Sequence, residues 1–291
     1  MNNFGLNYEI RVQANDGGAD IIIKPPFTIE FNVMRNRYSS AALSEIRIYN
    51  LSENNRAQLR KNQVGADVGV QKKIVFKAGY GTDLATILIG NVQWGYSIRT
   101  GTEYITTLQA FDGGFAYTSA EVEKEYKEGT PYRNIIADLL KTLKPYGIAV
   151  GSIGVDKRIA SRGLSVSGPT IRNLKELTNN LFFIDNSTAH VLKPTECVPA
   201  PLRVLSSASG LLGTPFKERE YVDIELLFEP KLRCAQILEL DSSTGKNFNG
   251  IYTIISMGHS GIISEAVPSK VTTKLSLAFG QGTYTEIPGN F

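Results

Sequence analysis

The sequence predicts a mainly β protein with an α/β insert, in which two antiparallel β-barrel domains flank a small α+β middle region. Polar and apolar residues alternate over the first and last thirds of the chain, as they do in half-buried strands. Between these parts, apolar residues recur at helical spacing. Glycine-containing turns separate the predicted strands. We expect domains at residues 1–117, 118–205 and 206–291.

The first domain is predicted to be a barrel of six or seven strands with one flanking helix. Residues 27–33 alternate strictly, with Phe27, Ile29, Phe31 and Val33 on one face. Ser52 is a good N-cap for a short helix that reaches Arg60 and packs Leu59 on the sheet. Further strands are predicted around residues 46–48, 74–76, 86–94 and 103–111, with turns at Asp16-Gly17-Gly18, Gly79-Tyr80-Gly81 and Thr100-Gly101.

The middle region switches to helical spacing after the charged stretch 121–128. Thr130 is expected to cap a helix with Pro131 at its first position, and Pro145 with Gly147 ends it. A second helix begins near Thr170. The apolar stripes of the two helices are Ile135, Ile136, Leu139, Leu140 and Leu143, and then Ile171, Leu174, Leu177 and Leu181. Two short strands follow at residues 182–185 and 189–193, joined by Asn186-Ser187-Thr188.

The last domain returns to alternation and is again of barrel size. Strands are predicted at residues 221–228, 235–240, 251–257 and 270–279, with turns at Ser243-Thr244-Gly245 and His259-Ser260-Gly261. These turns carry the glycine and small polar residues that tight connections favour.

Composition excludes several classes of protein. The 291 residues carry a net charge of +3, which is too small a bias to indicate nucleic-acid binding. The N-terminus has no secretory pattern and no apolar run is long enough to span a bilayer, so we expect folding in a cytoplasm and no membrane insertion. Cys197 and Cys234 show no metal or redox spacing and are expected to be buried free thiols, although a bridge between them stays open.

No catalytic, cofactor-binding or metal-binding residue is predicted. Two histidines, His190 and His259, are too few for a histidine-rich metal site or a conventional triad. Gly79-Tyr80-Gly81 reads as a hairpin turn, and Thr244-Gly245-Lys246-Asn247 lacks the leading glycine of a phosphate-binding loop. The acidic cluster Glu121, Glu123, Glu125 and Glu128 is predicted to be a solvated surface run.

Three ordered sets of segments together resemble the baseplate hub proteins of tailed phages and of related contractile bacteriocins. They are residues 46–52, 76–81 and 87–92; then 129–131, 147–148, 151–153 and 183–186; and then 210–215, 226–232, 250–255 and 259–261. The resemblance covers about residues 27–280 and is carried by the order of the segments. Arg233-Cys234 stands where relatives often have Pro-Gly, and Ile262 where an aspartate is common, which affects turns more than chemistry.

The resemblance implies two tail-tube-like barrels in each chain, so that a homotrimer forms a pseudo-sixfold ring. Such a ring would join a hexameric tail tube to a trimeric central spike and continue the DNA channel. The implied partners are the tail tube protein, the central spike protein, the tape measure protein and other baseplate proteins, and DNA would pass the lumen without specific binding. The implied location is the virion tail baseplate, assembled in the host cytoplasm, and no enzymatic activity is implied.

Two other functions stay open from the sequence. One is a tail-associated peptidoglycan-degrading enzyme, which needs only two suitably spaced carboxylates. The other is a carbohydrate-binding β-sandwich with exposed aromatic residues. For the hub, we expect the hairpin 86–111 and strands between about residues 235 and 257 to pair edge to edge across subunits around a neutral or acidic lumen. Proline at Thr106 or Thr107 should then impair the ring more than proline at Thr100.

Overall fold

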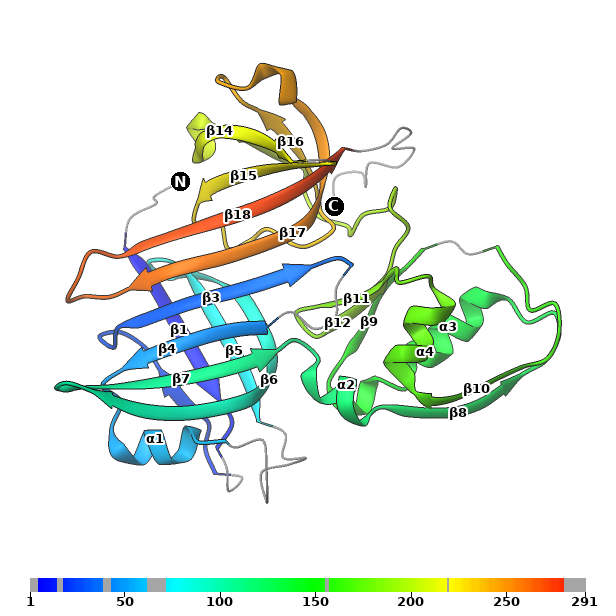
Figure 1. Cartoon of the computed structure of the whole chain (residues 1–291), viewed down its shortest axis with the longest axis horizontal. Helices are drawn as coiled ribbons and strands as arrows, with labels where there is room; N and C mark the ends of the chain where they lie inside the picture. Colours follow the sequence, from blue (N-terminus) through cyan, green and yellow to red (C-terminus); the bar gives the residue numbers. More distant parts are fainter. Residues whose placement is uncertain are drawn as a thin grey trace.

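The computed structural model describes residues 5–14, 18–38, 43–61, 72–154, 157–218 and 220–279. Figure 1 shows three parts: strands β1–β7 with helix α1, the middle part with α2–α4, and strands β13–β18. Asp16 and Gly17 of the first predicted turn lie outside the described residues.

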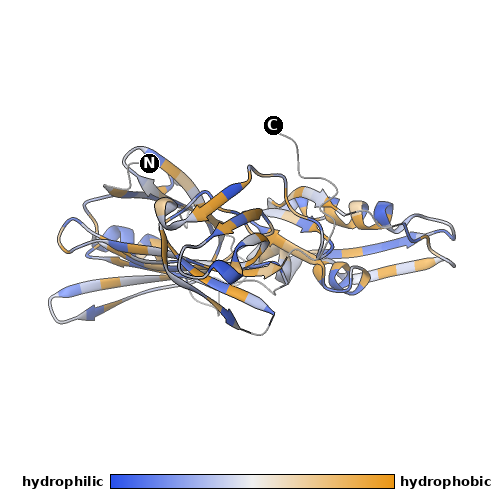
Figure 2. Cartoon of the chain, turned by 90° about the horizontal axis from the view of Figure 1, so that it is seen from above, coloured by the Kyte–Doolittle hydropathy of each residue, from blue (hydrophilic) through white to orange (hydrophobic). Residues whose placement is uncertain are grey.

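The outer two parts consist almost entirely of strands. The first contains β1 (Leu6–Val12), β2 (Ile21–Ile23), β3 (Ile29–Asn36), β4 (Leu43–Tyr49), α1 (Glu53–Leu59), β5 (Lys73–Tyr80), β6 (Asp83–Thr100) and β7 (Glu103–Phe111). The last contains β13 (Arg203–Ser206), β14 (Leu211–Glu218), β15 (Tyr221–Leu227), β16 (Ile237–Asp241), β17 (Gly250–Ile263) and β18 (Lys270–Phe279). Hydropathy alternates along these strands, which gives each strand one core-facing and one outer side (Figure 2).

The middle part is a small α+β unit. It contains α2 (Gly114–Ser119), β8 (Glu121–Tyr126), α3 (Tyr132–Lys141), β9 (Ala149–Ile153), β10 (Leu164–Pro169), α4 (Thr170–Leu177), β11 (Phe182–Asp185) and β12 (Thr188–Val191). Strand β8 pairs with β10, and β11, β12 and β9 form a separate three-stranded sheet.

The outer parts are joined into one sheet of thirteen strands. Its order is β14-β15-β18-β17-β3-β4-β7-β6-β5-β1-β2, with β16 pairing both β13 and β17. The contact between the parts is the antiparallel ladder of β17 with β3, from Ser256↔Asn36 to Ile263↔Ile29. The mainly β fold with an α+β middle region is confirmed, but the described strands form one open sheet in place of two closed barrels. Strand β17 of the last part pairs with β3 of the first part. Alternation of polar and apolar residues within each part does not predict this pairing.

Three large apolar clusters underlie the three parts. The first is built by β1–β7 with Phe228, Ile263 and Val271 from the last part, the second by the middle part, and the third by β13–β18. All five predicted apolar residues of α3 and its C-terminal end are buried, as are Ile171 and Leu174 of α4. The domain limits at 117 and 205 stay predictions.

Helix α1 begins as predicted, because the Ser52 side chain accepts a hydrogen bond from the Asn55 N–H at 3.3 Å. The predicted cap of α3 is wrong by one residue. Pro131 is the N-cap, and Thr130 instead donates its hydroxyl to the Lys127 carbonyl at 2.7 Å. A proline in the extended conformation suits a position outside the helix as well as the first helical one.

The predicted turn at His259-Ser260-Gly261 is wrong. These residues lie inside β17, where His259 pairs with Val33 on one side and Thr273 on the other. A Cβ on Gly261 would lie 2.0 Å from the Lys270 carbonyl oxygen, so this glycine permits close approach of two strands. The residues Ser260-Gly261 alone do not distinguish a tight turn from a place where two strands approach closely.

Two buried arginines, Arg35 of β3 and Arg37 just after this strand, attach the middle part to the sheet. Arg35 lies 3.2 Å from the Asp185 carboxylate and donates to Asn186 Oδ1 at 3.1 Å and to the Ile87 carbonyl. Arg37 donates to the carbonyls of Leu192, at 3.2 Å, and Lys193. Both arginines therefore contact the β11–β12 hairpin or the chain that follows it.

Candidate functional site

One side of the large sheet is a continuous outer surface, which we call the polar face. It comprises the outward side chains of β14, β15, β18, β17, β3, β4, β7 and residues 94–100 of β6. One row of paired residues crosses seven of these strands: Leu227, Thr272, Ser260, Asn32, Glu45, Gln109 and Trp94. The face therefore continues without a break from the last part of the chain to the first.

The polar face is hollowed where the two outer parts meet. A depression of about 730 Å³ is lined by side chains that include Glu30, Glu45 and Lys270. A second, of about 510 Å³, is lined by Asp223, Glu225 and Leu212 among others. Met34, Gly258 and Lys274 line both, so the depressions adjoin. Together they form a shallow trough across the junction.

The polar face is acidic although the chain as a whole is basic. Among the side chains that the structure describes, this face carries five acidic ones (Glu30, Glu45, Glu103, Asp223 and Glu225) against three basic ones (Arg47, Lys270 and Lys274). This difference gives a charge of −2, compared with +3 for the whole sequence. Arg35 of β3 points to the opposite side of the sheet, and both Arg35 and Arg37 are buried.

Three ion pairs or hydrogen bonds order the centre of this face. Arg47 lies 2.8 Å from Glu45 and 3.3 Å from Glu30. Gln109 donates to Glu45 at 3.1 Å. The neighbouring carboxylates raise the pKa of the Arg47 guanidinium, which remains charged. Because these groups are exposed, their contribution to stability is small, and their main effect is to set the local charge.

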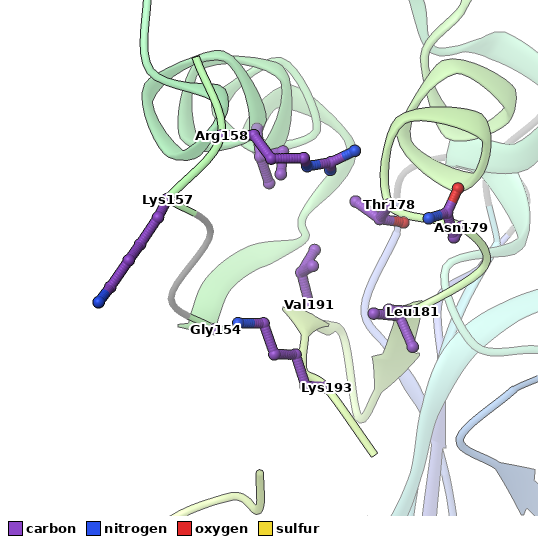
Figure 3. A pocket seen from close by; sticks show the side chains of 9 residues that line it. Gly154, Lys157, Arg158, Thr178, Asn179, Leu181, Val191 and Lys193 are labelled. Atoms are coloured by element: carbon purple, nitrogen blue, oxygen red, sulfur yellow. The ribbon is translucent and has the colours of Figure 1, made fainter. Parts of the chain in front are cut away.

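The middle part contains a separate pocket of about 570 Å³ (Figure 3). Ile136, Leu181 and Val191 form apolar walls, and Arg158 and Lys193 lie on opposite sides of the opening. The lining residues in the described part of the chain include no carboxylate and no histidine. Arg158 donates to the Leu177 carbonyl at 3.1 Å and lies over the Tyr132 ring, so it completes the end of α4. The pocket offers no acid–base pair.

Both histidines are packed among other residues. His259 is fully buried, its Nδ1 lies 2.9 Å from the Thr273 hydroxyl, and burial lowers its pKa to about 3. His190 accepts a hydrogen bond from the Ser152 N–H at 3.0 Å and stacks on Phe183, and burial lowers its pKa as well. Among the described residues, no three metal-ligating side chains gather. Neutral, enclosed imidazoles suit packing more than proton transfer with a substrate.

The remaining sequence features have these positions. Glu121, Glu123 and Glu125 are exposed as predicted but lie on strand β8, which sequence reasoning missed. Thr244-Gly245-Lys246-Asn247 lies in the connection between β16 and β17, as predicted. Cys234 is buried, Cys197 is partly exposed, and both are free thiols. Within the part of the chain that the structure describes, no helix has the length and apolar character needed to cross a bilayer.

Sequence reasoning did not identify the polar face. Each strand shows which residues share one side, but the side that meets solvent across eight strands depends on the order of the strands. The pairing of β17 with β3 links residues more than 200 positions apart. The exposed polar side of β3, with Glu30 and Asn32, was the one signal available in the sequence.

Two solved structures with a similar fold are described as tail proteins. The tail protein of Neisseria meningitidis MC58 is similar with a TM-score of 0.60 at 10% identity, covering 94% of this chain and 97% of that one. The 43 kDa tail protein of prophage MuSo2 from Shewanella oneidensis has a TM-score of 0.60 at 10% identity, with 93% and 96% coverage. At these identities the likeness shows the fold alone.

A third structure links the fold to secretion systems. The E. coli c3393 protein has a TM-score of 0.53 at 9% identity and covers 87% of this chain and 73% of its own. It is described as a component of the type VI secretion system with structural similarity to T4 bacteriophage tail proteins gp27 and gp5. No curated protein sequence matches the chain significantly.

The family model described as baseplate hub gp41 matches residues 9–272. This range includes all the strands of the polar face except β18, of which it covers only the first three residues. This match extends over most of the chain and agrees with the tail-protein fold. The chain therefore belongs to the baseplate hub gp41 family of phage tail structural proteins.

Proposed function

We propose that the chain is a hub subunit that continues the tail tube, as a homotrimer whose polar face lines the channel. The observation that carries the proposal is the continuous polar face, which joins two similar four-stranded units within one chain. These units are β14-β15-β18-β17 and β3-β4-β7-β6. Three chains would contribute six such units, which matches a hexameric tube on one side while the other side keeps threefold symmetry for a spike.

The charge of the polar face suits a DNA channel. Phosphate groups bind basic surfaces with high, salt-dependent affinity, so a lumen that lets DNA slide should not be basic. A face with a charge of −2 per chain meets this requirement. The proposed partners are the tail tube, central spike, tape measure and other baseplate proteins, and the proposed location is the virion baseplate after assembly in the host cytoplasm.

We also propose that the chain has no enzymatic activity and that the domains are residues 1–117, 118–205 and 206–291. The three apolar clusters support this division, because their buried residues fall within these limits apart from five: Ala116, Leu205, Phe228, Ile263 and Val271. The pocket of the middle part lacks carboxylates, which disfavours glycoside hydrolysis there.

The oligomeric mass tests the proposal. By light scattering, we expect the purified chain to form trimers, weakly when alone and stably when its tube and spike proteins are added. A chain that is monomeric even with both partners would refute the trimeric hub.

A further inference from the structure

The two halves of the large sheet repeat the same strand order. The first half runs β3-β4-β7-β6-β5-β1 and the last half runs β14-β15-β18-β17-β16-β13. In each half the first two strands of this order are antiparallel, namely β3 with β4 and β14 with β15. A long strand, β6 or β17, then forms a hairpin with β7 or β18. Only the last pair of strands in this order differs between the halves, because β13 and β16 are parallel while β1 and β5 are antiparallel. Strands β6 and β17 therefore occupy equivalent places.

The equivalent long strands share an unusual pairing. β17 pairs β16 over Gly250–Thr253, has an irregularity between Ile254 and Ser256, and then pairs β3 along the same edge. β6 pairs β5 up to Asn91, has an irregularity between Val92 and Trp94, and meets Lys61 at Gly95. Beyond Gly95, no described strand pairs with this edge of β6. The position that β3 fills beside β17 is thus open beside β6.

The strand equivalent to β3 is β14, and its outer edge is also open among the described residues. β14 pairs only with β15. It carries Phe216, which at 65% exposure is the most exposed large apolar side chain in the described part of the chain, and Leu212. At the other end of the polar face, β6 exposes Trp94 and Ile98. Both open edges therefore carry apolar side chains on the same face of the sheet.

We propose that residues 96–100 of β6 in one copy of this chain pair with β14 of the next copy, repeating the β17–β3 contact between chains. We call this contact between chains the seam. It rests on the proposed trimer, and it identifies the strand edges that close the ring of three chains. An edge of one end meeting a different edge of the next copy is a head-to-tail contact, which closes into a ring of three when successive copies are related by a third of a turn. Exposed sheet edges otherwise promote aggregation, and a closed ring removes them.

The seam has a defined extent. Pro215 cannot donate a hydrogen bond, and the register of β14 is irregular between Leu212 and Phe216. Backbone pairing is therefore confined to the end of β14 from Phe216 onward, while Phe216 and Ile98 pack across the contact. This assignment replaces the pairing of residues 235–257 across subunits, because β16 and β17 already have partners on both edges.

Cysteine cross-linking tests the seam. In a Cys197→Ser background, Ile98→Cys and Phe216→Cys are combined, so that each chain carries one thiol at each open edge. Both positions are exposed, so the fold should tolerate them. After mild oxidation in the presence of tube and spike proteins, we expect covalent dimers and trimers on a denaturing gel. Ile22→Cys with Val267→Cys, also exposed but outside the seam, is the matched control and should stay monomeric.

The outcomes separate the seam from the hub itself. A trimer by light scattering in which the seam pair gives no more cross-linking than the control pair would overturn the seam and leave the hub intact. Absence of any trimer with both partners present would remove the proposed function and the seam together. Mixing single-cysteine chains should give covalent dimers but no trimers, because a head-to-tail contact joins unlike edges.

Discussion

Replacing Arg35 with alanine is expected to lower the free energy of unfolding by about 3–5 kcal/mol, because it leaves a buried carboxylate without its cation. Arg35 and Asp185 are both 6% exposed, and the charged groups lie 3.2 Å apart. The change also removes the hydrogen bond from Arg35 to Asn186, which attaches the β11–β12 hairpin to the sheet, and the hydrogen bond to the Ile87 carbonyl of β6. Urea unfolding measures the loss.

Arg47→Ala is the control for this prediction. Arg47 lies on the polar face, with an exposed side chain next to Glu45 and Glu30, and its removal should cost no more than about 1 kcal/mol. Hydrogen exchange should also increase along β11 and β12 in the Arg35 variant only. Equal losses of stability in the two variants would contradict the assigned role of Arg35.

The second large effect concerns His259 and pH. Its pKa is lowered from 6.5 to about 3, first by burial and then by Arg35. The folded state therefore prefers neutral imidazole, and the stability that follows is complete above pH 6.5 and is lost as pH falls towards 3. The loss is about 1.4 kcal/mol for each pH unit in this window. Nε2 of His259 has no hydrogen-bond partner, so an added proton would be unpaired.

Asp112 acts in the opposite direction. Its pKa is raised from 3.8 to about 7 by desolvation and by Asp185, so the folded state prefers the protonated carboxyl. The free energy of unfolding therefore increases through this group as pH falls from 7 to about 4. The two effects partly cancel in the wild type, and the informative quantity is the difference from a His259→Gln variant. The variant should gain stability relative to wild type by about 1.4 kcal/mol per pH unit below 6.5. A difference that does not change between pH 7 and 4.5 would contradict the account, and His190→Gln is the comparison variant.

The structure changes what proline at Thr106 or Thr107 would test. Thr106 and Thr107 are buried in β7, between β4 and β6, so proline there removes hydrogen bonds within one chain. Such variants would fail to fold before they failed to assemble. Substitutions at the exposed positions Ile98 and Phe216 avoid this problem, because neither side chain belongs to the core.

Local signals predicted most elements, and long-range pairing limited the rest. The stripe of Ile135, Ile136 and Leu139 marks a helix face unambiguously, and the alternation of residues 27–33 marks a strand. Helix α2 was missed because Gly114–Ser119 is a single short helix without a side-chain cap. Strand β8 was missed because its charges hide the inward-facing Val122.

The polar face itself needed the topology. Nothing in the sequence around Ser260 indicates that it pairs with Asn32, since complementary strand edges carry no residue code of their own. The family resemblance is confirmed by the match to the baseplate hub family model, but it did not supply the strand order that places Glu30 and Glu225 on the same surface.

Imaging of the assembled complex tests the central claim most directly. Electron cryo-microscopy of the chain with its tube and spike proteins should show a closed ring of three copies, with Glu30, Asn32 and Glu225 of each copy facing the channel. A ring in which these residues lie on the outer surface, or a single copy bound beside the channel, would contradict the account.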